Sequence, residues 1–220
     1  MPKILFEDKF IIVCIKPGGV ASELTSSGND MPTLLSDHRA DRGEDDYIGV
    51  VHRLDMPVGG VMVYTKRNDT AAQLSKQMAD GAFSKEYLAI VEGHTEDEGR
   101  MEDLLFHDKA KNKTYVVDRE RKGVHHAALE FSTLARKEID GNEYSLVKIK
   151  LLTGKTHQIR VQFASRRMPL LGDGKYGASN SNCPIALWSH TLSFVHPKSG
   201  KTVSFSQEPD KSSLPWLLFK

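Results

Sequence analysis

One short segment of this chain carries the residue types best suited to chemistry. An apolar run, Ile48 to Val51, predicts a buried strand, and it ends in the polar sequence His52, Arg53, Leu54 and Asp55. Pro57 and two glycines then break the backbone before a second apolar strand. A carboxylate held by a strand and exposed on a turn is well placed to act as a nucleophile. Positive charge on Arg53 and His52 would keep Asp55 ionised, since a nearby cation lowers a carboxyl pKa by roughly 1–3 units.

An ordinary turn accounts for the same residues, because a turn aspartate often hydrogen-bonds its own backbone. The local pattern alone favours this second interpretation. A catalytic assignment for Asp55 therefore needs support from residues elsewhere in the chain.

The elements before and after this segment must position it. Ile4 to Lys16 predicts two strands joined by a short turn. Residues 21 to 46 are polar and weakly patterned, and we expect a mobile flap with a short helix near residues 33 to 39. Val61 to Tyr64 predicts a strand, and Asn68-Asp69 is expected to cap a helix that runs to about Ala79.

The second half predicts strands with one inserted helix. Phe83 to Glu92 is expected to be a strand, whereas residues 101 to 118 show only a weak, basic pattern. The Asp140-Gly141-Asn142 turn is expected to join strands 127 to 134 and 144 to 152. A helix over Thr156 to Arg167 would make His157 and Arg160 neighbours on its surface. Gly172 to Gly177 predicts a glycine-rich loop, which is either a phosphate cradle or a tight turn. Ala186 to Val195 and Thr202 to Ser206 predict a hairpin. Leu214 to Phe219 predicts an apolar end that packs onto the rest of the fold.

Turns join most of the predicted strands, and helices are inserted singly. This order indicates an α+β fold with a largely antiparallel mixed sheet and flanking helices. No internal repeat or linker divides the chain, so we expect one domain over residues 1–220.

Composition excludes several classes of protein. A hydrophobic content of 39% and a charged content of 27% are typical of a soluble globular chain. No apolar run approaches the ~20 residues needed to span a bilayer, and the first residues do not form a signal peptide. The two cysteines, Cys14 and Cys183, are expected to be buried thiols in a reducing compartment. We therefore expect a cytoplasmic protein, with a monomer as the default.

The net charge of +1 means that any nucleic acid would be bound by local patches of charge. One such patch contains alternating lysines followed closely by three further cations: Lys109, Lys111, Lys113, Arg119, Arg121 and Lys122. A run of charge is also the ordinary pattern of a solvated surface. The nine histidines show no metal-ligand spacing, which makes a metal-dependent hydrolase a weak alternative.

Five ordered blocks of sequence give a sharper indication. They are Lys16-Pro17, the sequence HRLD at 52–55, FSKEYLA at 83–89, TGKTHQIRV at 153–161, and PLLGDGKYG at 169–177, and a sixth, LSFVHP, follows at 192–197. In this order the chain resembles the RluA-type family of RNA pseudouridine synthases. The resemblance covers nearly the whole chain and is weakest in residues 21–46 and 100–125. It implies the catalytic fold of that family, with a central cleft, and no separate N-terminal RNA-binding domain, because Ile4 already begins the catalytic body.

The resemblance implies an enzyme that isomerises uridine in ribosomal or transfer RNA, with no cofactor and no metal. Asp55 matches the family's catalytic aspartate, Tyr87 its active-site tyrosine, and Arg160 the arginine that pairs with the aspartate. Arg53 matches the arginine that enters the RNA stack when the uridine flips out. Four further residues match positions near the site, or lie beside the motif, and are expected to contact RNA: His52, Lys155, His157 and Gln158. Lys16 is expected to do the same.

Four residues depart from the family pattern. Val58 and Gly59 replace a threonine and a serine that usually follow the aspartate, so two hydroxyls are missing. Gln162 and Gly18 stand where a histidine and a serine are common. These departures leave a second function open, that of an RNA-binding or RNA-folding module of the same fold with weak or no catalysis.

Overall fold

The computed structural model describes residues 2–220. The described residues form two compact units, and each unit is built from two separate stretches of chain. Unit 1 comprises Met1–Lys85 and Ser189–Glu208, and unit 2 comprises Glu86–Trp188 and Pro209–Lys220. Two of the three boundaries fall inside strands, β5 (Ser84–Glu92) and β10 (Leu187–Val195), and the third lies in a loop between Glu208 and Pro209. This explains why the sequence shows no linker.

Unit 1 contains a sheet whose order is β1-β2-β4-β10, with β3 paired to β4 and β11 paired to β10. The pairings β1–β2, β2–β4, β3–β4 and β10–β11 are antiparallel. The predicted strands at residues 4–16, 48–51, 61–64 and 202–206 are therefore confirmed, with these bounds: β1 (Lys3–Glu7), β2 (Ile11–Lys16), β3 (Gly49–Val50), β4 (Gly59–Thr65) and β11 (Thr202–Ser206).

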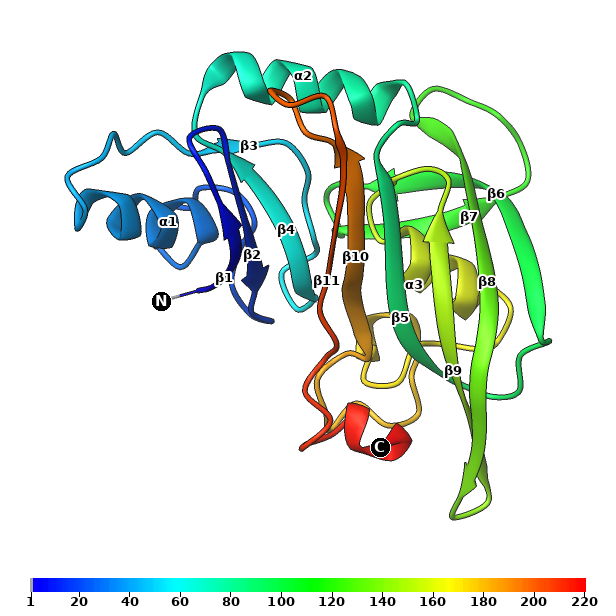
Figure 1. The fold of residues 1–220 in the computed structure, drawn as a ribbon. Helices are drawn as coiled ribbons and strands as arrows, with labels where there is room; N and C mark the ends of the chain where they lie inside the picture. The colour runs from blue at the N-terminus through cyan, green and yellow to red at the C-terminus, as the bar shows by residue number, and fades with distance from the viewer. Residues whose placement is uncertain (1) are drawn as a thin grey trace. The chain divides into compact units, whose positions relative to one another are not determined.

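Two helices lie beside these strands, as Figure 1 shows. Helix α1 (Met31–Ala40) confirms the short helix predicted in the polar segment, and the Asp30 carboxylate caps it by accepting a hydrogen bond from the Thr33 N–H at 2.8 Å. Helix α2 (Asn68–Ala79) was predicted with the correct length but the wrong cap. Its N-cap is Arg67, which makes no side-chain capping bond, because Asn68 already has helical geometry.

The core of unit 1 is continuous because nearly every residue of β2 and β4 is buried and most of them are apolar. Burial removes these side chains from water and stabilises the sheet against α2. The buried cluster contains Ile11, Val13, Val61, Val63, Leu74, Phe83, Leu192 and Phe194. The rings of Phe83 and Phe194 are stacked with their centroids 5.3 Å apart.

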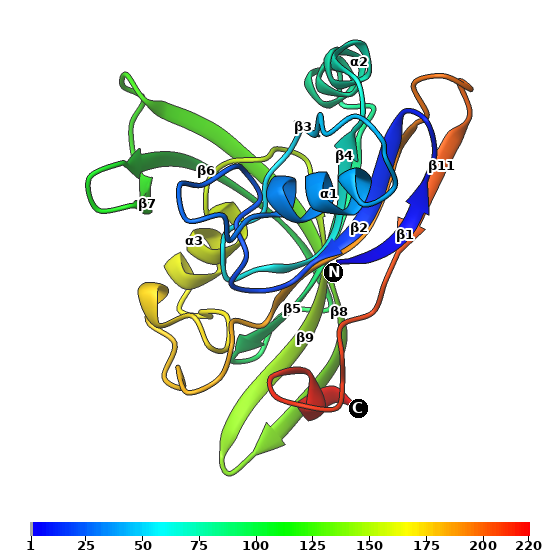
Figure 2. The same ribbon diagram turned by 90° about the vertical axis from the view of Figure 1, so that its left-hand side faces the viewer.

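Unit 2 is built on longer strands in the order β5-β9-β8-β6-β7. The pairs β6–β7, β6–β8 and β8–β9 are antiparallel. Figure 2 shows the long β8–β9 hairpin, whose turn at Asp140 and Gly141 has both residues at positive φ, 52° and 73°. That hairpin was predicted, whereas the β6–β7 hairpin was not. The bounds are β6 (Glu98–Asp108), β7 (Lys113–Val117), β8 (Val124–Ile139) and β9 (Asn142–Leu151).

Helix α3 (Gln158–Ser165) packs against β6, β7 and the short 3₁₀ helix η1 (Gly174–Tyr176). It is shorter than predicted and begins after His157, whose φ of 56° lies in the left-handed region. His157 is thus the N-cap of α3 and not a residue within the helix, and both His157 and Arg160 contact the ring of Tyr176. The apolar C-terminal end forms η2 (Trp216–Phe219), and Trp216 and Phe219 join a buried cluster with Leu88, Ile90, Leu171 and Ala186.

The α+β class with largely antiparallel pairing is confirmed by these elements. Within residues 2–220, no helix has the length and apolar character that crossing a membrane requires. Over the same residues, no group of three or more His, Cys, Asp or Glu side chains has an arrangement that could hold a metal ion. Both cysteines are free; Cys14 is buried as expected, but Cys183 is only partly buried.

Candidate active site

Asp55 lies on a turn between β3 and β4, and a buried lysine, Lys16, donates a hydrogen bond to the backbone of this turn. The backbone N–H of Val58 donates to the Asp55 carbonyl at 2.9 Å, which closes the turn. Lys16 has no exposed surface, and its ammonium donates to the carbonyls of Pro17, Val20 and Met56 at 3.0, 2.6 and 3.1 Å. Burial lowers the pKa of Lys16 to about 8, and the negative charge of Asp55 opposes this shift. Lys16 therefore acts on Asp55 through charge and through the turn, and it presents no surface to RNA.

Ser22 fixes the residue before Asp55, although sequence reasoning assigned it no role. Its hydroxyl accepts from the Leu54 N–H at 3.0 Å and donates to the Leu54 carbonyl at 2.9 Å. The Tyr64 hydroxyl in turn donates to the Ser22 carbonyl at 3.1 Å. Ser22 and Tyr64 are buried, so these bonds are shielded from water. The segment at residues 21–46 thus supports the Asp55 turn.

His52 is a neutral core residue, and the expectation that its charge acts on Asp55 is wrong. The Val63 N–H donates to His52 Nε2 at 3.1 Å, which requires that nitrogen to be unprotonated. Burial, and then the charge of Lys85, lower the pKa of His52 to about 3. Its ring lies against Phe83 with centroids 5.6 Å apart. Only 8% of His52 is exposed, which makes it a poor contact for RNA.

Unlike the buried His52 next to it, Arg53 extends its side chain into solvent. Its side chain is 58% exposed and donates to the Glu23 carboxylate at 2.8 Å. An exposed pair of this kind contributes little stability, about 0–1 kcal/mol. The guanidinium is therefore available to a planar or anionic partner.

The other predicted residues of the site belong to unit 2. Tyr87 lies on β5 and is 6% exposed. Arg160 on α3 is buried and makes a two-point bond to Asp173, with Nε and Nη2 donating at 2.7 and 2.8 Å. Such paired charge-assisted bonds fix both the position and the plane of a guanidinium. Asp173 is a functional candidate that sequence reasoning missed, although it lies in the PLLGDGKYG block.

The glycine-rich loop around Asp173 is a tight turn. Most of its backbone N–H groups already donate to carbonyls, including those of Asp173 to Leu170 at 2.9 Å and of Tyr176 to Asp173 at 3.0 Å. Gly172 has a φ of 81°, and a Cβ there would collide with the Pro184 carbonyl oxygen. The loop thus presents the Asp173 carboxylate to Arg160, and the tight-turn interpretation is the one that its contacts support.

Two of the residues expected to contact RNA instead hold the backbone before α3. The Gln158 amide accepts from the Thr153 hydroxyl at 2.8 Å and the Lys155 N–H at 3.0 Å, and it donates to the Ala128 carbonyl at 3.0 Å. His157 is buried, and its Nδ1 lies 2.9 Å from the Tyr176 hydroxyl. Lys155, at the tip of the turn that Gln158 organises, is exposed.

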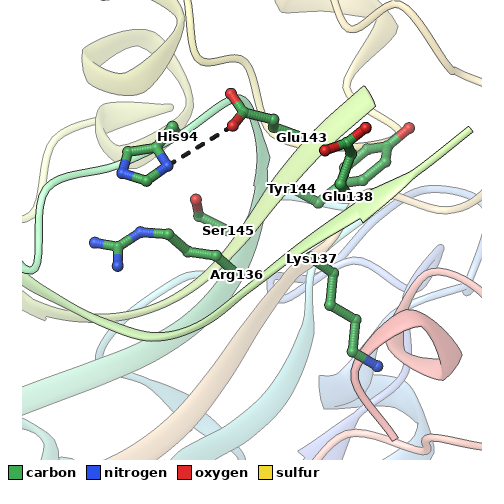
Figure 3. A pocket seen from close by; sticks show the side chains of 7 residues that line it. All are labelled: His94, Arg136, Lys137, Glu138, Glu143, Tyr144 and Ser145. Carbon is green, nitrogen blue, oxygen red and sulfur yellow. Dashed lines mark ion pairs between the residues drawn. The ribbon is translucent and has the colours of Figure 1, made fainter. Parts of the chain in front are cut away.

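A polar pocket of about 160 Å³ lies elsewhere in unit 2 and contains none of the predicted residues. Figure 3 shows its lining, with His94 and Glu143 forming an ion pair at 3.9 Å and Lys137 directed away. Arg136 is committed to the Thr95 carbonyl, to which Nε and Nη2 donate at 3.0 and 2.7 Å. The polar side chains that line this pocket thus make structural contacts near the end of the β8–β9 hairpin. The lining residues are His94, Arg136, Lys137, Glu138, Glu143, Tyr144 and Ser145.

Comparison with known proteins decides the family. The family model of RNA pseudouridylate synthases matches residues 10–165. The chain belongs to the RNA pseudouridylate synthase family. Its members convert uridine in RNA to pseudouridine, so this chain is an RNA-modifying isomerase, as the motifs predicted.

Relatives of this pseudouridine synthase match along nearly its whole length. An uncharacterised RNA pseudouridine synthase of Aquifex aeolicus is 35% identical, over 97% of this chain and 72% of the relative. Ribosomal large subunit pseudouridine synthase D of Zymomonas mobilis is 31% identical, over 99% of this chain and 72% of the relative. The structure of human RNA pseudouridylate synthase domain containing 1 has the same fold, with a TM-score of 0.79 at 19% identity, over 96% of this chain and 84% of that one.

Three departures from the motifs of this pseudouridine synthase family now have a local explanation. A Cβ on Gly18 would lie 2.9 Å from the Pro57 carbonyl oxygen, so the turn leaves little room for a larger residue. Val58 is 2% exposed, and its methyl groups lie in the interior next to the Asp55 turn. Gln162 donates to Asp103 at 2.7 Å, while its buried Oε1 makes no hydrogen bond within the described residues.

Proposed function

We propose that this chain isomerises specific uridines of ribosomal or transfer RNA, with Asp55 as the catalytic carboxylate. The support of the Asp55 turn is the observation that carries the proposal. A fully buried ammonium, a buried serine and a closed turn fix the backbone that carries this one carboxylate. The ribosomal target is suggested by the name of the Zymomonas relative.

The proposed reaction needs a fixed anion and a displaced base. The uracil must leave the ribose at its nitrogen, rotate, and reattach through a ring carbon, and a carboxylate can either attack or stabilise the detached state. A uridine cannot react inside a helix and must flip out, at a cost of a few kcal/mol. We assign to the exposed Arg53 the stacking role that fills the vacated space, because its guanidinium is planar.

Tyr87 and Arg160 complete the proposed catalytic set. We propose that Tyr87 stacks on the uracil or assists removal of the ring-carbon proton. We propose that Arg160 keeps Asp55 ionised, which the Asp173 carboxylate supports by fixing the plane of the guanidinium. Residues 1–220 would act as one catalytic domain on RNA, as a monomer in the cytoplasm, with Lys155 and the cations of residues 109–122 as further RNA contacts.

The test compares native protein with Asp55→Asn, which keeps the shape of the side chain and removes its charge. RNA from cells that lack this gene is treated with each protein, and new pseudouridines are mapped by chemical labelling and sequencing. We expect Asp55→Asn to lose activity at least about a thousandfold while its RNA affinity stays within about threefold. Asp46→Asn, an exposed aspartate of the preceding loop, is the matched control and should match native activity.

Buried methyl groups at Val58, in place of a hydroxyl, favour the second candidate, an RNA-binding module with weak catalysis. Under that function the native protein would bind RNA and form no new pseudouridine at any site. Equal activity of native protein and Asp55→Asn would instead retain the enzyme and reject Asp55 as its catalytic group.

A further inference from the structure

Tyr176 contacts three parts of unit 2 at once. Its hydroxyl accepts from the Thr114 N–H of β7 at 2.8 Å and lies 2.9 Å from His157 Nδ1, at the start of α3. Its own backbone N–H donates to the Asp173 carbonyl at 3.0 Å. Its ring packs on the cluster of Leu105, Ala127 and Val161.

Two cations share the ring of Tyr176. The Arg160 guanidinium carbon lies 5.1 Å from the ring centroid, and Lys113 Nζ lies 5.2 Å from it. Both distances are within the range of a cation–π interaction, which is strengthened where water is excluded. Arg160 is therefore held on one side by the two-point bond to Asp173 and on another by an aromatic ring.

The same ring and its loop are tied to the hairpin β6–β7. Thr114 is buried, and its hydroxyl donates to the Thr156 carbonyl at 2.8 Å. Lys175, next to Tyr176, donates to the Asn112 carbonyl in the hairpin turn at 3.0 Å. The hairpin carries the exposed cations Lys109 and Lys111. Its position and the position of Arg160 are thus coupled through residues 175 and 176.

We propose that Tyr176 is a positioning residue that joins the basic β6–β7 hairpin to Arg160, so that RNA gripped by the hairpin meets a correctly oriented guanidinium. The proposal rests on the proposed function for the role of Arg160 in the reaction. Under this proposal the β6–β7 hairpin affects the rate of the chemical step, although none of the family's sequence motifs lies in it. Tyr176 itself touches neither RNA nor the reacting atoms in this role.

Two substitutions separate the contributions of the hydroxyl and the ring. Tyr176→Phe keeps the ring over Arg160 and removes the hydroxyl contacts with Thr114 and His157. Tyr176→Leu removes the aromatic ring as well as these hydroxyl contacts. Tyr115→Leu is the matched control, because Tyr115 is a partly exposed tyrosine of the same hairpin whose ring lies 5.9 Å from Lys113 Nζ. Circular dichroism and thermal melts establish the folded fraction of each variant, to which all rates are normalised.

The first readout requires no activity. Arg160 Nε–H is expected to give a slowly exchanging NMR signal in the native protein, because it donates to a buried carboxylate. We expect this signal to exchange at least about tenfold faster in Tyr176→Leu and to be unchanged in Tyr115→Leu. An equally protected Arg160 signal in folded Tyr176→Leu would overturn the proposal, even if the native protein formed no pseudouridine.

The second readout is the split between kcat and KM on the RNA substrate. We expect kcat to fall about tenfold in Tyr176→Phe and about a hundredfold in Tyr176→Leu, with KM within about twofold of native. A merely structural role would reduce the folded fraction and leave the rate per folded molecule unchanged, which would overturn the proposal. A native protein without activity would reject the proposed function, and the NMR readout would then decide on Tyr176 alone.

Discussion

A lysine with no exposed surface is a costly residue to bury, and Lys16 shows what such a residue provides. Its ammonium donates to three backbone carbonyls, one at Met56 in the Asp55 turn and two, at Pro17 and Val20, in the segment after Lys16, so one charge ties the two segments together. A neutral side chain of similar size would leave those carbonyls without donors. We conclude that the Lys-Pro block supports Asp55 from within the fold.

The ionisation of Lys16 predicts opposite pH trends for activity and stability. Burial lowers its pKa from 10.5 to about 8 against the opposing charge of Asp55, so the folded chain loses this proton earlier than the unfolded chain. Between those values the unfolded state binds more protons, so the stability of native protein relative to Lys16→Met should increase with pH. Activity should fall over the same interval, because the turn loses its ammonium.

Urea unfolding of both proteins at several pH values from 7 to about 10.5, with rate measurements at the same points, tests this pair of trends. A constant stability difference across that interval would show that Lys16 titrates normally.

The sequence motifs named individual residues but did not reveal their burial or their bonding partners. The HRLD and TGKTHQIR blocks predicted RNA contacts at His52, His157 and Gln158, but each side chain is buried and bonded to backbone or to another side chain. Burial depends on residues far away in sequence, such as Phe83 beside His52. The partnership of Arg160 with Asp173 was equally hidden, since the two are 13 positions apart in different elements.

At the scale of elements, hydrophobic periodicity predicted the strands that bury one face and the strands that bury both faces. It failed for the β6–β7 hairpin, whose strands alternate irregularly because charged side chains occupy positions on both faces. It also placed the start of α3 too early, because the left-handed geometry of His157 leaves no mark in an apolar pattern. Turn chemistry gave the correct answer at Asp140-Gly141, where both residues favour positive φ.

The basic hairpin and the segment after it should bind RNA through charge. Arg119, Arg121 and Lys122 are exposed, and the Arg121 guanidinium lies 4.8 Å from the ring centroid of Phe106. Replacing all three with Gln should weaken RNA binding and reduce the slope of log K against log salt by about two to three. A triple Gln variant at exposed lysines of unit 1, residues 76, 198 and 201, is the control. Parallel salt plots for native protein and the first variant would remove this segment from the interface.

The glycine-rich loop predicts a graded loss of stability. Gly172 and Gly177 have φ values of 81° and 90°, but only at Gly172 would a Cβ collide with backbone, the Pro184 and Cys183 carbonyls. Gly177→Ala should therefore cost about 1 kcal/mol from backbone strain alone, and Gly172→Ala about 3 kcal/mol or more. Chemical denaturation of both variants gives the two values. Equal losses would mean that the loop relaxes away from the clash.

At the scale of the molecule, a group of ion pairs ties the first strand of unit 1 to α1 and to the end of β4. Glu7 accepts from Lys66 at 2.9 Å, from Arg42 at 2.9 Å and lies 3.0 Å from His38. Burial raises the pKa of Glu7, but the hydrogen bonds from His38, Lys66 and Arg42 outweigh it and bring the pKa to about 2.

Acid should remove this contribution to folding. A carboxylate with a lowered pKa in the folded state stabilises fully above its unfolded value of 4.5, and the effect is lost as pH falls through about 2. The stability difference between native protein and Glu7→Gln should therefore be largest near neutral pH and shrink in acid. Thermal melts from neutral to acidic pH measure it, with Glu98→Gln, an exposed glutamate on β6, as the control. A difference that does not change with pH would exclude Glu7 as the acid-sensitive group.

The interleaved chain path has a consequence for how the protein is made. A ribosome delivers residues 1–85 first, yet the strand that completes their sheet, β10, is synthesised about a hundred residues later. Trp216 and Phe219, which close the core of unit 2, lie after β10 in the chain. Neither unit can therefore finish folding before the segment from β10 to η2 has been synthesised. Removal of residues 214–220 should then impair folding far more than the small size of this segment suggests.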